Sequence, residues 1–113
     1  MAHFALVAPP LMGHLNPTLA LADSLRQRGH RTTYFGPIDC ADAVTRTGAA
    51  FHALGAKSHA PGTLAARQAA LGKVSGMRGM ATTIWHMVND TRMLGAQLPN
   101  ALTQAGCDAV ICD

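Results

Sequence analysis

The order of segments in the first third of the chain constrains the fold more than any other feature. Residues 4–8 form a continuous apolar run that stops at two prolines, and residues 31–35 form a second run rich in β-branched and aromatic side chains. Between them, Asn16 followed by Pro17 is typical of a helix start, and Gly29 is typical of a helix end. A strand, a helix and a strand within about 35 residues have the size of a βαβ unit, in which the two strands are parallel.

The rest of the chain repeats this alternation more weakly. In order, we expect a short helix at residues 39–47, a strand at 50–54, a loop with no more than one helical turn at 55–72, an amphipathic helix at 77–98 and a strand at 108–113. The long helix is predicted from apolar residues three and four positions apart. We expect Pro99 to end it and a further helical stretch to follow and to end at Gly106. The predicted fold class is therefore α/β, an open parallel Rossmann-like sheet with helices on both faces.

Length and composition set the broad class of protein. A chain of 113 residues fits one domain, and 49% hydrophobic residues against 13% charged ones are enough to form a core. No apolar run approaches the ~18–20 residues that cross a bilayer, and the amino terminus lacks the pattern of a secretory signal, so we expect a cytoplasmic protein. A net charge of +3 and 4% aromatic residues disfavour a nucleic-acid-binding protein.

The three cysteines follow neither a disulfide nor a zinc-binding pattern. Cys40, Cys107 and Cys112 include no CxxC pair and lie in no dense cluster with histidine. We therefore expect neither a disulfide framework nor a metal site.

Basic residues are unevenly distributed along the chain. Residues 43–89 contain five of them and no acid at all. One interpretation is a solvated face. The other is a surface attracted to anionic lipid, which adds about 1 kcal/mol for each basic residue near a membrane. Peripheral contact with the inner face of a membrane is thus one expectation for this stretch.

The loop after the first predicted strand lies where doubly wound folds bind their ligands. It contains neither GxGxxG nor a P-loop lysine, and its two prolines have no N–H to offer a phosphate, so we do not expect a nucleotide there. Its His14 can accept a proton from a hydroxyl near neutral pH. Asp113 ends the last predicted strand, which in the usual order lies beside the first, so its carboxylate is expected near His14. A surface or helix-capping histidine is the alternative.

Several segments together carry a resemblance to a known family. They are residues 4–10, GHLNP at 13–17, RGH at 28–30, APGTL at 60–64 and the closing stretch at 108–113. With them the whole chain resembles the amino-terminal domain of the family-one nucleotide-sugar glycosyltransferases of GT-B fold. It is most similar to the branch that glucosylates carotenoids such as zeaxanthin. The GHxxP element alone is a modest signal, but at the end of a first strand and followed by RGH it is fairly specific.

The resemblance implies a mechanism and assigns roles to two residues. It makes His14 the general base that deprotonates an acceptor hydroxyl, and Asp113 the carboxylate that supports it. It implies an inverting transfer from a nucleotide sugar, most simply a UDP-sugar, as co-substrate, with no further cofactor and no metal. In that family a carboxyl-terminal domain holds most of the sugar nucleotide. Residues 1–113 are therefore expected to be an acceptor-binding domain that is incomplete, lacks the donor-binding domain and is inactive alone.

A hydrophobic acceptor needs an adaptable apolar wall, and the chain offers one. Methionine adapts to irregular ligands, and four methionines with one tryptophan occur in the long predicted helix and its surroundings. The residues expected to bind the acceptor are Met12, Gly13, Met80, Ile84 and Trp85. Packing of the same helix in the core is the alternative interpretation for Met77, Met80, Met87, Met93 and Trp85.

The rival function is a small flavodoxin-like binding or interaction module without catalysis. It shares the predicted fold and differs in having no chemistry at the first loop. The glycosyltransferase hypothesis predicts a small-molecule acceptor and a nucleotide sugar as partners, and no nucleic acid. An uncovered sheet edge and apolar face would also favour self-association of the chain.

Overall fold

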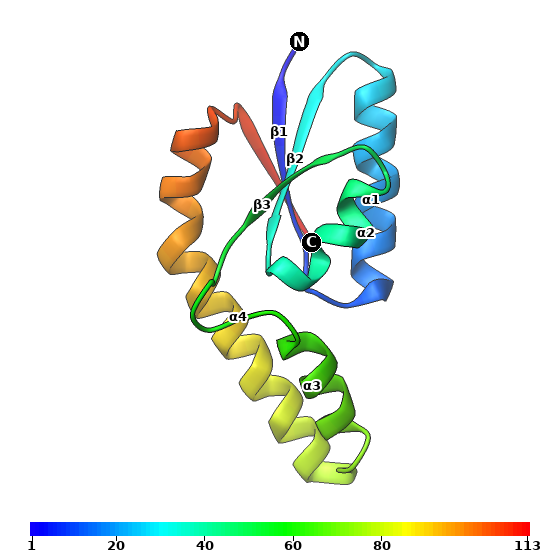
Figure 1. The fold of residues 1–113 in the computed structure, drawn as a ribbon, viewed down its shortest axis with the longest axis vertical. Helices are drawn as coiled ribbons and strands as arrows, with labels where there is room; N and C mark the ends of the chain where they lie inside the picture. The colour runs from blue at the N-terminus through cyan, green and yellow to red at the C-terminus, as the bar shows by residue number, and fades with distance from the viewer.

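A computed structural model of the protein describes residues 1–113 and contains one four-stranded parallel sheet (Figure 1). Its strands, in chain order, are β1 (His3–Val7), β2 (Arg31–Gly36), β3 (Ala50–Ala53) and β4 (Ala109–Cys112). Their order across the sheet is β3-β2-β1-β4, and all three pairings are parallel. The last strand thus lies beside the first, and the predicted α/β fold class is confirmed.

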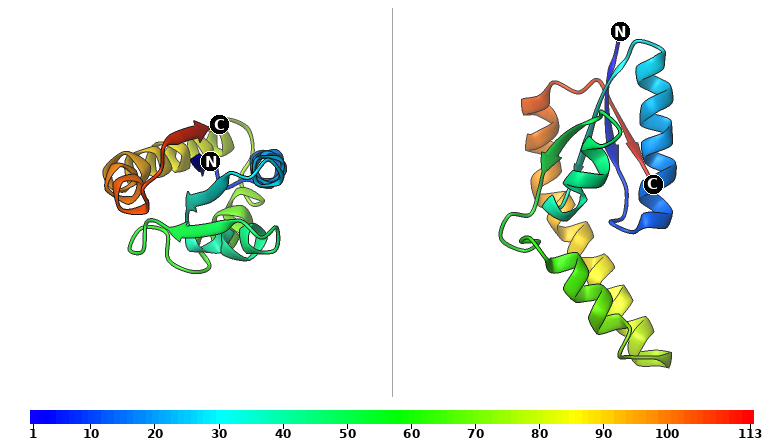
Figure 2. Two further views of the ribbon diagram at one scale, coloured as in Figure 1. Left: turned by 90° about the horizontal axis from the view of Figure 1, so that it is seen from above. Right: turned by 45° about the vertical axis from the view of Figure 1, so that its right-hand side comes forward.

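Helices cover both faces of this sheet (Figure 2). They are α1 (Met12–Gln27), a 3₁₀ turn η1 (Ile38–Cys40), α2 (Ala41–Thr45), α3 (Thr63–Leu71) and α4 (Gly76–Ala105). One core joins Leu6 and Tyr34 of the sheet to α1 and α2, and the other joins Phe35 to Met93 and Ala101 of α4. Neighbouring residues of a strand point to opposite faces. Tyr34 and Phe35 are therefore both fully buried, each in a different core.

Helix α1 begins at Met12, five residues before Pro17, the predicted first helical residue after an N-cap at Asn16. The extended Leu11 is its N-cap, and the Leu11 carbonyl accepts hydrogen bonds from the backbone N–H groups of His14 and Leu15. The first turn is therefore closed upstream of Asn16. Pro17 then lies inside the helix, where its missing N–H costs one bond but does not end the helix.

The structure corrects two further predictions about helices. The predicted loop at 55–72 contains the nine-residue helix α3, which starts directly after Gly62. Gly62 itself has a left-handed backbone conformation, with a φ of 90°. The two helical stretches predicted before and after Pro99 form one helix, α4, which does not end at Pro99 but at the left-handed Gly106, as predicted for the second stretch. Because Met93 and Ala101 on either side of Pro99 are buried against the sheet, tertiary packing holds both parts of α4 in one helix.

Helix α3 and the first turns of α4 extend beyond the sheet as a helical hairpin, and we call α3 together with residues 76–92 the arm (Figure 1). The molecule is consequently elongated, with principal extents of 46 × 25 × 21 Å. No residue of α3 is buried, and the buried residues of α4, Met93 and Ala101, both lie outside the arm. None of the helices combines the length and the apolarity that a membrane-spanning segment requires.

Candidate active site

The carboxyl ends of β1 and β4 bring the first loop and the end of the chain together. Val7 of β1 pairs with Cys112 of β4, so the residues that follow both strands emerge at the same edge of the sheet. The backbone N–H of Asp113 donates to the Val7 carbonyl at 3.0 Å and extends this pairing by one residue. On the other side, the first loop turns directly into α1, whose first turn carries His14.

At this edge the side chains of His14 and Asp113 form a hydrogen-bonded pair. The distance from His14 Nδ1 to Asp113 Oδ2 is 2.6 Å, and the two side chains are 47% and 50% exposed. An ionised carboxylate only accepts hydrogen bonds, so Nδ1 carries the proton and donates it. The lone pair of the neutral ring then lies on Nε2, which makes no hydrogen bond in the structure. A half-exposed nitrogen with a free lone pair can accept a proton from a bound hydroxyl.

Next to this pair, the first loop and the arm enclose a cavity of about 300 Å³, which we call the loop cavity. It is lined by Pro9, Pro10, Leu11, Met12, Leu64, Arg67, Gln68, Leu71, Thr83, His86, Met87 and Asp90. Met12 is one of the residues predicted to bind an acceptor, and it lies two positions before His14. Gly13 lies between them, and the space that a Cβ would occupy there is open.

The other predicted acceptor residues lie elsewhere on α4. Met80, Ile84 and Trp85 are exposed and do not line the loop cavity. Met87 does line it, whereas Met93 packs in the core between α4 and the sheet. The methionines therefore divide between a cavity, a core and an exposed surface, so neither of the two alternative interpretations holds for all of them.

The sequence interpretation missed a polar cluster that joins the arm to the loop after β3. Asp90 Oδ1 of α4 accepts hydrogen bonds from Arg67 Nη1 of α3 at 2.7 Å and from His59 Nε2 at 2.6 Å. His59 is fully buried, and its Nδ1 accepts a hydrogen bond from the Ser58 hydroxyl at 2.8 Å. The signal available in the sequence is that Asp90 is the first acid after the acid-free stretch at 43–89.

Two other ionisable groups near the arm have displaced pKa values. The backbone N–H groups of Gly62 and Leu64 donate to the Asp39 carboxylate at 2.9 Å each, and they hold the pKa of Asp39 below its usual value. Burial, followed by the nearby charge of Asp39, raises the pKa of the Cys40 thiol to about 11. Cys40 is therefore protonated near neutral pH and is a packing residue. No three His, Cys or Asp side chains are grouped closely enough to share a metal ion.

Comparison with curated proteins finds glycosyltransferases. The chain is 35% identical over 113 residues to the zeaxanthin glucosyltransferase of Pantoea ananas, which is all of this chain but 26% of that protein. It is 53% identical over 49 residues to the demethyllactenocin mycarosyltransferase of Streptomyces fradiae, covering 43% of this chain and 11% of that protein. No protein-family model matches the chain. The chain thus spans about a quarter of the length of the relative that it matches along its whole length.

Solved structures give the same result for the fold. The glycosyltransferase of kitacinnamycin superposes with a TM-score of 0.68 at 29% identity, over 99% of this chain and 24% of that one. The calicheamicin glycosyltransferase CalG4 superposes with a TM-score of 0.67 at 23% identity, over 100% of this chain and 27% of that one, which supports the fold alone. In sequence and in fold, the chain is related to the amino-terminal part of the family-one GT-B glycosyltransferases.

Proposed function

We propose that this chain is the acceptor-binding domain of an enzyme that transfers a sugar from a UDP-sugar to a hydroxyl of a hydrophobic acceptor such as a carotenoid. The observation that carries the proposal is the 2.6 Å contact between His14 Nδ1 and Asp113, which leaves Nε2 with a free lone pair. The zeaxanthin glucosyltransferase of Pantoea ananas, similar along the whole chain, supports the choice of acceptor class.

In the proposed reaction, His14 Nε2 takes the proton of the acceptor hydroxyl as the oxygen attacks the anomeric carbon of the sugar. The bond between that carbon and the phosphate oxygen breaks, and the nucleoside diphosphate leaves with the electron pair. Attack from the face opposite the leaving group inverts the anomeric configuration. Asp113 stabilises the imidazolium that forms and keeps Nε2 as the accepting nitrogen. Neither step requires a metal or a further cofactor.

We assign the acceptor to the loop cavity. Apolar side chains of the first loop and of both arm helices line it, among them Leu11, Met12, Leu71 and Met87. Its polar residues, Thr83 and Gln68 among them, provide hydrogen bonds that orient a hydroxyl-bearing ligand. An acceptor that enters along the arm would present its hydroxyl end to the loop beside His14.

The test of the mechanism uses the chain joined to a sugar-nucleotide-binding domain, either its own or that of the Pantoea ananas relative. His14→Ala should lower kcat by about 10²–10⁴-fold, the usual contribution of general acid–base catalysis, with little change in the affinity for the sugar nucleotide. His30→Ala is the matched control, because His30 follows α1 at the opposite end of the helix and its ring accepts a hydrogen bond from the Ala2 N–H. Equal turnover in His14→Ala and His30→Ala would exclude His14 as the base.

The role of Asp113 as a positioning residue is tested by Asp113→Asn. The amide NH₂ of asparagine can donate to Nδ1, which places the ring proton on Nε2 and removes the accepting lone pair. We expect kcat to fall while KM for the acceptor stays nearly constant, because Asp113 does not line the loop cavity. A change in KM alone would assign Asp113 to acceptor binding instead.

The proposal that a separate domain binds the sugar nucleotide also predicts how strongly the 113-residue chain binds it. The first loop has no glycine-rich phosphate site, so calorimetric titration with UDP-glucose should show weak binding or none. Tight stoichiometric binding would contradict the assignment of the sugar nucleotide to a separate domain.

We further propose that the enzyme is cytoplasmic. We also propose that the exposed apolar residues of the arm, Met77, Met80, Ile84 and Trp85, contact the inner face of the membrane, where a hydrophobic acceptor is dissolved. Met77 is 89% exposed and Trp85 is 59% exposed, and Lys73 and Arg78 lie at the tip of the same arm. Apolar side chains beside basic ones bind anionic lipid surfaces. Sedimentation with vesicles containing phosphatidylglycerol should show binding that Trp85→Ser together with Arg78→Gln weakens. Equal sedimentation of wild type and variant would reject this surface.

A further inference from the structure

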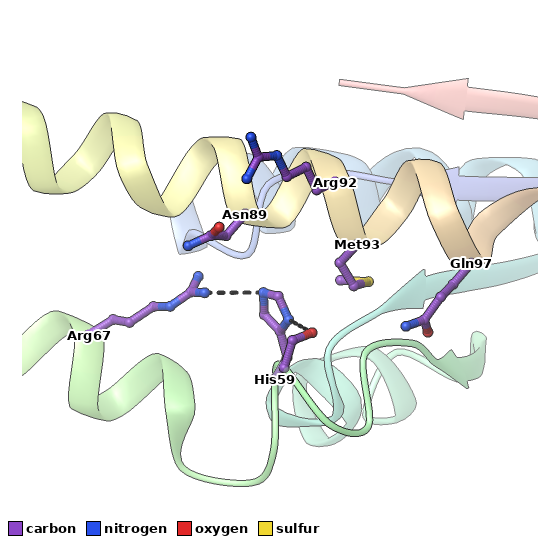
Figure 3. Close-up of a pocket in the computed structure, with 7 residues that line it drawn as sticks. His59, Arg67, Asn89, Arg92, Met93 and Gln97 are labelled. Atoms are coloured by element: carbon purple, nitrogen blue, oxygen red, sulfur yellow. Dashed lines mark hydrogen bonds between the residues drawn. The ribbon is translucent and has the colours of Figure 1, made fainter.

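A second cavity, of about 440 Å³, lies where the arm meets the loop after β3, and we call it the arm cavity (Figure 3). It is lined by Ser58, His59, Arg67, Asn89, Arg92, Met93 and Gln97. None of these residues belongs to the first loop or to α1, so the arm cavity is separate from the His14 pair. Arg67 is the one residue that lines both cavities, and nothing in the proposed transfer uses the arm cavity.

The charge around the arm cavity is positive. No carboxylate lines it, whereas two arginines do. The nearest acid on the same helix, Asp90, is already bound by Arg67 Nη1 at 2.7 Å and by His59 Nε2 at 2.6 Å. Arg92 makes no hydrogen bond and no ion pair within the chain, so its guanidinium is an unmatched charge at the cavity wall.

The polar groups around Arg92 are mainly hydrogen-bond donors. The Gln97 Oε1 atom accepts a hydrogen bond from the Gly55 N–H at 2.8 Å, which fixes the amide and leaves its NH₂ group to donate. The Asn89 amide lies on the same wall, one helical turn before Arg92. The cavity thus offers the unpaired guanidinium of Arg92 and the partly exposed one of Arg67, together with the amides of Asn89 and Gln97. Such a set of donors is complementary to an anion with several acceptor oxygens.

We propose that the arm cavity binds the phosphate group of a phosphorylated small molecule, with Arg92 as the main contact and Arg67, Asn89 and Gln97 as supporting donors. Guanidinium groups bind phosphate through paired N–H donors, and the phosphate has oxygens for the amides as well. Inorganic phosphate would fill a small part of 440 Å³, so the cavity has room for the group that carries the phosphate. That group belongs either to a free metabolite or to a lipid headgroup.

The test measures binding to the 113-residue chain and does not depend on sugar transfer. The probes are inorganic phosphate, glycerol 3-phosphate and vesicles containing phosphatidic acid. We expect saturable binding of glycerol 3-phosphate by calorimetry or by NMR shifts at Asn89 and Arg92. Arg92→Gln should weaken it by about tenfold or more, since it removes one charge-assisted pair. Arg46→Gln, at an exposed arginine outside both the cavity and the arm, is the matched control and should not weaken it.

A second variant tests the sign of the charge. Gln97→Glu keeps an oxygen that can accept the Gly55 hydrogen bond but adds a negative charge to the wall, so it should abolish phosphate binding while circular dichroism shows an intact fold. Vesicle binding that is lost in Arg92→Gln and Gln97→Glu would identify a lipid headgroup as the source of the phosphate. The proposal is overturned if no probe binds saturably, or if Arg92→Gln and Arg46→Gln bind glycerol 3-phosphate alike.

Discussion

The body around the sheet and the arm are held together by different forces. In the body, two apolar cores lie on opposite faces of the sheet, and fully buried Leu6, Tyr34 and Phe35 belong to them. In the arm no residue is buried, and its contacts with the body are mainly polar: the cluster of His59, Arg67 and Asp90, and the Leu64 N–H that donates to Asp39, with Leu64 partly packed against the core. Apolar burial is strong and non-directional, whereas the cluster depends on hydrogen-bond geometry.

This difference bears on the two candidate functional features of the chain, the His14–Asp113 pair in the body and the cavity walls in the arm. The body places His14 in the first turn of α1, shortly after β1, and Asp113 directly after the adjacent strand β4, so their 2.6 Å contact depends on the pairing of two strands that line the cores. The arm supplies most of the wall of the loop cavity and part of the wall of the arm cavity, and none of its residues is buried, so its sequence can vary with less cost to the sheet. We therefore expect the proposed catalytic pair to be more rigid than the walls of the two cavities.

The largest expected effect on stability comes from the body. Leu6→Ala removes a fully buried side chain and should lower the free energy of unfolding by about 2–5 kcal/mol. Met77→Ala, at the tip of the arm and 89% exposed, should change it by about 0.5 kcal/mol or less. Denaturation in urea measures both. Similar losses in the two variants would mean that the arm and the body share one core.

An intermediate effect is expected where the arm meets the body. Asp90→Asn removes the negative charge that His59 and Arg67 share, and it should cost roughly 1–3 kcal/mol, less than for a fully buried pair because Arg67 and Asp90 are partly exposed. Amide hydrogen exchange should accelerate in α3 and in the first turns of α4 and stay slow in the sheet. The control Asp23→Asn removes a surface pair with Arg26 and should leave the exchange of α3 unchanged. Faster exchange throughout the chain would contradict a separate arm.

The smallest effect concerns the start of α3. The Asp39 carboxylate accepts hydrogen bonds from the backbone N–H groups of Gly62, the N-cap of α3, and of Leu64 in its first turn, and these bonds lower its pKa in the folded protein. The stabilisation is therefore complete above the unfolded pKa, near 3.8, and is lost as pH falls through the lower folded value. Asp39→Asn should lower the stability at neutral pH by about 1 kcal/mol or less.

Thermal denaturation between pH 2 and pH 7 measures this dependence. The difference in Tm between wild type and Asp39→Asn should shrink on the acid side. Asp42→Asn is the control, because the carboxylate of Asp42 makes no hydrogen bond or ion pair in the structure. A difference in Tm that stays constant down to pH 2 would show that the carboxylate charge is not what caps α3.

Local sequence patterns predicted the sheet well and the helix ends poorly. The strands were predictable because runs such as residues 4–8 are apolar on both faces and end at prolines or glycine. Helix ends depend on contacts between distant segments. Asp39 lies 23 residues before Gly62 and supplies a cap for α3 that the local sequence lacks. Similarly, packing of Met93 and Ala101 on the sheet outweighs the tendency of Pro99 to end α4.

The same distinction applies to the candidate sites. His14 and Asp113 were predictable as neighbours, because two parallel strands that lie side by side present their carboxyl ends at one edge. His59 and Asp90 are 31 residues apart, on a loop and a helix whose relative position no local pattern specifies. The loop cavity combines the first loop with two helices of the arm, one of which the sequence did not reveal. Met80, Ile84 and Trp85 have the spacing of a helix face, but spacing does not say what that face meets.

The elongated shape has a consequence for how much water the chain contacts. A compact protein of 11.8 kDa exposes about 5,900 Å² by the usual scaling of surface with mass, whereas this chain exposes 6852 Å². The excess of roughly 900 Å² is close to the ~800 Å² that one partner contributes to a standard protein interface. The arm, none of whose residues is buried, contributes to this excess, which equals the area that one further packing partner would remove from water.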